Sequence, residues 1–174
     1  MLRIVVIIII LAIIVALVYA ATKPDTFRIE RSKKIKAPPE KIAPFINDFY
    51  NMQTWSAWEK LDPAMMRTYS GAASGVGAKY AWEGNKNIGS GSMEITESIP
   101  TKIAMKLNFT APFEAHNIVE FTLTPNGDST TVNHAMFGPN PYISKLMGLI
   151  FSTEKMVGPK FEEGLAQLKT FAES

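Results

Sequence analysis

The first 21 residues form an apolar run in which Arg3 is the only charge. An apolar helix needs about 20 residues, and at least about 17, to cross a bilayer, so residues 4–21 are long enough. Two alternatives remain: a buried core helix, and a signal peptide cleaved after the small residues of Val18-Tyr19-Ala20. The run is longer than the roughly 7–15 apolar residues of a usual signal peptide. The pattern therefore favours an uncleaved transmembrane anchor over residues 1–21.

A short linker and a strand follow the apolar run. Pro24 and Asp25 predict a linker over residues 22–26, because proline is excluded from helix interiors and central strands. Alternating apolar positions predict a strand over residues 27–36, although Lys33-Lys34 breaks the alternation and indicates an edge or a bulge. We expect one folded domain to begin here and to extend over residues 27–174.

Two short helices are expected after this strand. A proline suits the first turn of a helix, and the stretch 40–49 places its apolar residues on one face. Pro44 breaks or tightens this helix, and Asn47-Asp48 is suited to cap a second turn. The residues that share the apolar face are Ile42, Phe45, Ile46 and Phe49.

Six segments with apolar residues at every second position follow the helices. Turn signals rich in glycine, proline and asparagine separate them, so consecutive strands must be antiparallel, because a parallel pair needs a crossover of a dozen or more residues. With the first strand they predict a seven-stranded antiparallel sheet. The six expected strands are residues 65–71, 78–84, 91–99, 102–109, 115–124 and 130–137.

The C-terminal part changes to a period of about 3.6 residues. One apolar stripe runs from Ile143 to Phe171 and stays in phase across Gly158-Pro159. We therefore expect a long helix that is kinked or restarted at these two residues, with both halves packed on the same surface. The apolar face of the sheet must be covered, and this helix is the only element long enough to cover it. The predicted fold class is α+β.

Seven short motifs occur in a fixed order along the predicted domain. They are residues 36–42 (Lys-Ala-Pro-Pro-Glu-Lys-Ile), 55–63 (Trp-Ser-Ala-Trp-Glu-Lys-Leu-Asp-Pro), 75–78 (Gly-Val-Gly-Ala), 82–84 (Trp-Glu-Gly), 91–95 (Gly-Ser-Met-Glu-Ile), 112–115 (Pro-Phe-Glu-Ala) and 138–141 (Gly-Pro-Asn-Pro). From about Phe27 to the end the chain resembles the START-like, or SRPBCC, superfamily. It looks most similar to the polyketide cyclase/dehydrase and lipid transport branch, and within it to a membrane-anchored subgroup of unassigned role.

This resemblance implies the helix-grip fold, in which a curved antiparallel sheet wraps around a long C-terminal helix, here with two short helices after the first strand. It also implies an apolar ligand cavity between sheet and helix. It does not imply that this chain cyclises anything, because one fold serves many functions.

Charge and composition narrow the function classes. The chain has 18 Lys+Arg and 16 Asp+Glu, which is far from the strongly basic character of a nucleic-acid-binding domain. Without cysteine, disulfides, thiol catalysis and cysteine-ligated zinc are excluded, and two distant histidines make no metal site. No cofactor is expected. A basic cluster after the linker can either touch anionic lipids or form the solvated face of a strand: Arg28, Arg31, Lys33, Lys34 and Lys36.

Alternation in the strands predicts which side chains face the covered side of the sheet. Many are aromatic or methionine, and the flexible methionine side chain suits a cavity that adapts to its ligand. Any one of them can instead be an ordinary core residue. The side chains expected to contact a ligand are Trp58, Tyr80, Trp82, Met93, Met105, Phe109, Phe121, His134, Met136, Met147 and Phe151.

Two polar residues fall on the predicted inner face. His134 alternates with Val132 and Met136, so its ring needs a partner or a ligand there, although a lone histidine is more often a satisfied core residue. Strict alternation from Met93 and Ile95 also turns Glu97 inward, where burial would raise its pKa and suit acid/base catalysis. The alternative for Glu97 is an exposed carboxylate at the strand end.

Three functions are compatible with these features. The first is a membrane-tethered module that binds an apolar or amphipathic small molecule or a lipid, with the bilayer as partner. The second is a cyclase- or hydratase-type enzyme that uses His134 or Glu97, and the third is a ligand-free accessory protein of the cell envelope with a chaperone-like role. We favour binding over catalysis. We expect a bacterial inner-membrane protein with a single N-terminal span, and the sequence leaves open on which side of the membrane the domain lies. The sequence identifies no protein partner.

Overall fold

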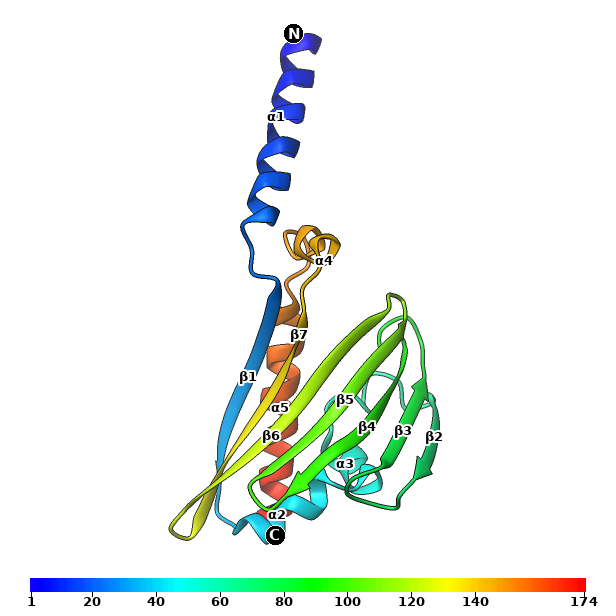
Figure 1. Ribbon diagram of the computed structural model, residues 1–174, viewed down its shortest axis with the longest axis vertical. Helices are drawn as coiled ribbons and strands as arrows, with labels where there is room; N and C mark the ends of the chain where they lie inside the picture. Colours follow the sequence, from blue (N-terminus) through cyan, green and yellow to red (C-terminus); the bar gives the residue numbers. More distant parts are fainter.

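One curved antiparallel sheet forms the body of the domain. In the computed structural model, which describes residues 1–174, seven strands pair in the order β1-β7-β6-β5-β4-β3-β2 (Figure 1). β1 is an edge strand, as Lys33-Lys34 indicated, and the expected antiparallel sheet is confirmed. The strands are β1 (Thr26–Ile35), β2 (Met66–Gly71), β3 (Ala78–Glu83), β4 (Ser90–Ile99), β5 (Lys102–Ala111), β6 (Ala115–Asn126) and β7 (Ser129–Pro139).

Two short helices connect β1 to β2, as expected. α2 (Pro39–Ile46) begins at a proline and contains Pro44 without ending there. α3 (Phe49–Trp55) starts after Asp48, whose side chain accepts a hydrogen bond of 2.8 Å from the Tyr50 backbone N–H. This contact satisfies one of the donors that a helix start leaves free, so the predicted cap is confirmed.

The long helix α5 (Thr153–Glu173) covers the inner face of the sheet and lies along β1 and β7 (Figure 1). Its apolar stripe supplies Val157, Phe161, Leu165 and Leu168 to a core that also takes residues from every strand except β2. The absence of a side chain at Gly158 lets the Arg31 side chain of β1 pack against α5, because a Cβ at this glycine would lie 2.3 Å from the Arg31 guanidinium. The helix-grip fold is thereby confirmed.

The prediction of one C-terminal helix from Ile143 onward was wrong. The chain instead forms α4 (Tyr142–Met147), leaves the helical path, and starts α5 at Ser152, whose hydroxyl accepts a hydrogen bond of 3.3 Å from the Lys155 N–H. The break covers residues 148–152 and so ends seven residues before Pro159, and α5 continues through that proline. An apolar period alone cannot distinguish one helix from two that share a phase, because the serine cap between them does not change the pattern.

The N-terminal helix α1 (Leu2–Ala21) extends away from the domain (Figure 1). It is long and apolar enough to cross a membrane, and nearly all of its side chains are exposed. At its end, Lys23 donates a 2.7 Å hydrogen bond to the Tyr19 hydroxyl. A tyrosine and a lysine are the residue types that hold a membrane helix at the level of the head groups.

Polar contacts hold the linker against the domain. Asn140 donates from its side chain to the Pro24 carbonyl (3.0 Å) and from its backbone to the Asp25 carbonyl (2.7 Å). Lys145 of α4 is buried and pairs with the Asp25 carboxylate at 2.6 Å, which lowers the pKa of Asp25. The linker is therefore attached at several points and is not a free tether.

The basic cluster does not gather at the end of α1. β1 runs away from α1, so Lys33, Lys34 and Lys36 lie at the far end of the domain (Figure 1). Arg31 pairs with Glu154 and Glu162 of α5, and Arg28 pairs with Glu30 at 2.7 Å. Lys33 and Lys34 are exposed and form no ion pair, so the cluster forms the solvated side of an edge strand.

Candidate functional site

A cavity of about 140 Å³ lies between the sheet, α3 and α5. Of its 23 lining residues, 17 are hydrophobic. Strands β3 to β7 form one wall, α5 contributes Val157, Phe161 and Gly164, and α3 closes the end with Phe49, Met52 and Trp55. The sheet curves around α5, and the cavity is the space that their side chains leave unfilled.

Most of the residues predicted to contact a ligand lie in this wall. Met105 is an exception: it is completely buried and belongs to the core, outside the wall. The residues of the predicted set that line the cavity are Trp58, Tyr80, Trp82, Met93, Phe109, Phe121, His134 and Met136. Apart from Trp58, which lies between α3 and β2, these residues lie on strands and face the side of the sheet that alternation predicts.

Met147 and Phe151 do not line the cavity, contrary to the prediction. They were placed there because their stripe was expected to continue into the covering helix. In the structure Met147 ends α4, and Phe151 is exposed in the turn before α5. The sequence analysis did not predict that α3 and part of α5 contribute residues to the cavity wall. For α5 the signal was present, because Val157 and Phe161 belong to the stripe that covers the sheet.

Aromatic rings form a continuous wall at one end of the cavity. Tyr80 stacks on Phe49 and on Trp82, with ring centroids 5.7 and 5.8 Å apart, and Trp82 meets Phe109 edge-on at 5.8 Å. Gly91 on β4 makes room for this arrangement, since a Cβ there would lie 2.6 Å from the Trp82 ring. The wall is therefore fixed by close packing, whereas the methionines around it can adapt.

His134 lies in the cavity wall between two aromatic rings. Its ring centroid is 4.1 Å from that of Phe121 and 3.6 Å from that of Phe161. Nδ1 of His134 is buried and has no hydrogen-bond partner, and it is the only side-chain atom in the structure in this state. Burial lowers the pKa of His134 to about 3, so its ring is neutral at pH 7.

A polar cluster borders the aromatic end of the cavity. Arg67 of β2 donates to the Glu59 carboxylate at 2.7 and 2.8 Å, and the Tyr80 hydroxyl donates to the same carboxylate at 3.0 Å. Burial, and then the charge of Glu59, raises the pKa of Tyr80. Glu59 and Tyr80 both belong to the cavity wall, and so does Lys160 of α5, which pairs with Glu163 at 3.1 Å. The charged groups of the wall are therefore paired, whereas the ring of His134 is not.

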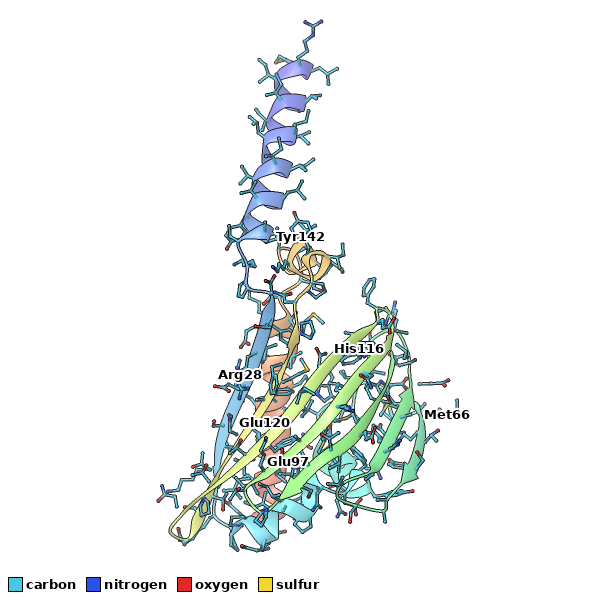
Figure 2. The ribbon with its side chains drawn as sticks, viewed as in Figure 1. Arg28, Met66, Glu97, His116, Glu120 and Tyr142 are labelled. Carbon is cyan, nitrogen blue, oxygen red and sulfur yellow. The ribbon has the colours of Figure 1, made fainter.

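Glu97 does not face the cavity, contrary to the prediction from alternation. The register of β4 with β5 shifts between Ile95 and Glu97, so one extra residue turns the next side chain to the other face. Glu97 lies on the outer side of the sheet, where its carboxylate accepts a 2.8 Å hydrogen bond from Lys102 (Figure 2). This contact raises the pKa of Lys102.

The chemistry available in the cavity is therefore limited. A base with a pKa of about 3 removes protons poorly at pH 7, so His134 is suited to orient a ligand more than to exchange protons with it. No three metal-ligating side chains meet in the structure. The arrangement offers apolar enclosure, the ring of His134, which makes no hydrogen bond within the protein, and charged groups that are already paired.

Comparison with known proteins agrees with this architecture. A family model described as polyketide cyclase / dehydrase and lipid transport matches residues 26–173. No curated protein sequence matches the chain.

Similar solved structures come from several bacteria. A protein from Mesorhizobium loti is 17% identical over 83% of this chain and 96% of its own, with a TM-score of 0.60. A protein from Chromobacterium violaceum is 18% identical over 87% and 99%, with a TM-score of 0.59. The Aha1 dimer from Colwellia psychrerythraea is 20% identical over 84% and 96%, with a TM-score of 0.58.

At these identities the structures support the fold alone. The family model, in contrast, extends from the start of β1 to the end of α5 and so includes every wall of the cavity. This chain belongs to the polyketide cyclase/dehydrase and lipid transport family.

Proposed function

We propose that this protein is a membrane-tethered binding module that holds a small apolar or amphipathic molecule between its sheet and α5. The observation that carries the proposal is the cavity of about 140 Å³ with its hydrophobic lining. An apolar cavity of about 150 Å³ is large enough to bind a single benzene ring. The unaltered cavity therefore suits a ligand with one ring or a short branched chain, and a full lipid tail needs its methionines to move.

His134 lines the cavity and its ring makes no hydrogen bond within the protein, which supports an amphipathic ligand over a purely apolar one. A buried polar group without a partner costs about 1–3 kcal/mol, which a ligand hydroxyl would recover by bonding to a ring nitrogen of His134. A hydroxyl both donates and accepts, so it fits this nitrogen in either tautomer of the ring. A phenol-like molecule, with one ring and one hydroxyl, combines both requirements.

The tethering part of the proposal is supported by the junction between α1 and the domain. Ala20, which ends the segment that offers a signal peptidase its small residues, is completely buried, and the Tyr142 hydroxyl donates to the Leu17 carbonyl at 2.9 Å. A segment removed by a peptidase has no need of contacts with the mature domain. The mass of the protein isolated from membranes tests this directly, because an intact anchor retains residues 1–20.

Intrinsic fluorescence offers a direct binding assay. All three tryptophans of the chain, Trp55, Trp58 and Trp82, line the cavity, and none lies in α1. The full chain is placed in nanodiscs of synthetic phosphatidylcholine and titrated with 4-methylphenol, with toluene and with palmitate. We expect saturable changes in emission with the two ring compounds, and binding about three- to ten-fold tighter for 4-methylphenol, which corresponds to one net hydrogen bond.

A matched pair of variants separates cavity binding from partitioning into lipid. Val157→Phe adds a ring inside the cavity, whereas Val76→Phe adds the same atoms on an exposed loop. The first variant should lose the saturable response and the second should keep it. A response that is absent in the natural chain, or equal in both variants, would contradict the proposed binding function.

A further inference from the structure

An apolar surface that the domain leaves uncovered lies beside α1. It consists of Ile143 on α4 and of Leu149, Ile150 and Phe151 in the turn that follows, and we call it the α4 patch. Ile143, Ile150 and Phe151 are 65%, 79% and 61% exposed. Since these residues neither enter the core nor line the cavity, they have no role inside the domain.

The position of α4 relative to α1 is fixed by contacts. The Tyr142 hydroxyl bonds to the Leu17 carbonyl, and α4 lies against the end of α1 (Figures 1 and 2). Leu17 is four residues before the end of α1, which corresponds to about 6 Å along the helix axis. Because Tyr19 and Lys23 mark the head-group level, α4 lies at the same depth.

The charges around the α4 patch also fit a lipid surface. Residues 140–152 contain no aspartate or glutamate, and their single charge, Lys145, is buried in its pair with Asp25. A segment that presents apolar side chains and no carboxylates can enter the head-group region without repulsion from anionic lipids. The tip of the β5–β6 hairpin, which carries the exposed Phe113, points toward the same end of the domain (Figure 1).

We infer that the α4 patch is a second membrane contact, inserted in the interfacial layer of the bilayer beside α1. The span and the patch together hold the domain in one orientation, with the ends of β5 and β7 and the start of α5 toward the lipid. Part of the cavity wall lies at this end, since Phe109 is close to the end of β5 and Val157 to the start of α5. This inference rests on the proposed tethering by α1.

The absence of cysteine allows clean labelling of single positions in the full chain. The variants Ile143→Cys, Ile150→Cys and Phe151→Cys carry an environment-sensitive nitrobenzoxadiazole label in vesicles of phosphatidylcholine and phosphatidylglycerol. Ile99→Cys, in the β4–β5 hairpin at the opposite end of the domain, is the exposed apolar control. Leu11→Cys, in the middle of α1, reports whether the anchor is inserted.

We expect the labels at 143, 150 and 151 to emit at shorter wavelength than the label at 99 and to lose most of their emission to nitroxide-bearing lipids. Labels that resemble position 99 while position 11 is protected would overturn the inference and leave the anchor intact. Labels shielded from water but not quenched by these lipids would also overturn it, because a second copy or another protein would then cover the patch. An unprotected label at position 11 contradicts the tether itself, which is a different result.

Discussion

His134 provides the most direct test of the energetics of the cavity. The substitution His134→Phe keeps an aromatic ring between Phe121 and Phe161 and removes the buried nitrogen that has no partner. The slightly larger ring can expand into the adjacent cavity of about 140 Å³. In the absence of ligand we therefore expect the variant to be more stable than the natural chain at pH 7 by about 1–3 kcal/mol.

The same residue makes the stability of the natural protein sensitive to acid. The pKa of His134 falls from 6.5 in the unfolded chain to about 3 in the fold, so between these values the unfolded chain binds one more proton. Stability is then fully present above pH 6.5 and decreases as the pH falls, by about 1.36 kcal/mol for each unit. Between pH 7 and pH 5 the natural chain should lose about 2 kcal/mol through this residue.

The assay is urea unfolding of the full chain in detergent, followed by tryptophan emission, at pH 7, 6 and 5. In this range most carboxylates remain ionised in both states, so their ion pairs add only a small part of the loss, and the comparison between variants isolates the part due to His134. His134→Phe should remove the loss of about 2 kcal/mol. His116→Gln is the matched control, since the His116 side chain is 65% exposed, and it should keep the slope of the natural chain.

If the free energy of unfolding of His134→Phe falls with pH as steeply as that of the natural chain, the reasoning is refuted. The loss then does not come from a neutral, unpartnered His134. It is also refuted if the variant is less stable than the natural chain at pH 7. That result would mean that the imidazole nitrogen is satisfied and contributes to the fold. A further consequence concerns binding: the variant should bind toluene and 4-methylphenol with equal affinity.

Three further substitutions test the packing around the cavity by urea unfolding. Gly164→Ala should stabilise the protein by about 0.5–1 kcal/mol, because alanine favours a helix and the new methyl lies 3.4 Å from the nearest ring atom; a loss would show that this ring cannot adjust. Gly91→Ala should destabilise by about 1–3 kcal/mol, because its methyl would lie 2.4 Å from the Asn108 carbonyl oxygen; an unchanged midpoint would contradict this close approach. Glu59→Gln should destabilise by about 1–3 kcal/mol, because it leaves the partly buried Arg67 without its counter-ion, and a neutral effect would mean that water already solvates the pair.

Local patterns predicted most of the secondary structure because each element shows its own period. The strands from Met66 to Pro139 and the cap at Asp48 follow from alternation and from side-chain chemistry within a few residues. Strand alternation identified seven residues of the cavity wall, since a side chain that faces the covered side of a sheet can also face a cavity there.

The misplaced residues have two physical causes. Glu97 was misplaced because a bulge adds one residue to β4, and a shift of one residue turns every later side chain to the other face. Met147 and Phe151 were misplaced because two helices in phase look like one, and only the cap at Ser152 separates them. The residues of α3 that close the cavity were missed because their approach depends on contacts distant in sequence.

The sequence by itself determined the apolar anchor, the α+β class, the antiparallel sheet and its inner face. These features depend on hydrophobic periodicity and segment length, which are local properties of the chain. The tertiary structure decided that the stripe around Ile150 stays outside the domain and that His134 lacks a partner. It also decided that a space of about 140 Å³ remains between sheet and helix. Such features depend on how side chains from distant elements fill, or fail to fill, the same volume, and no single segment carries that information.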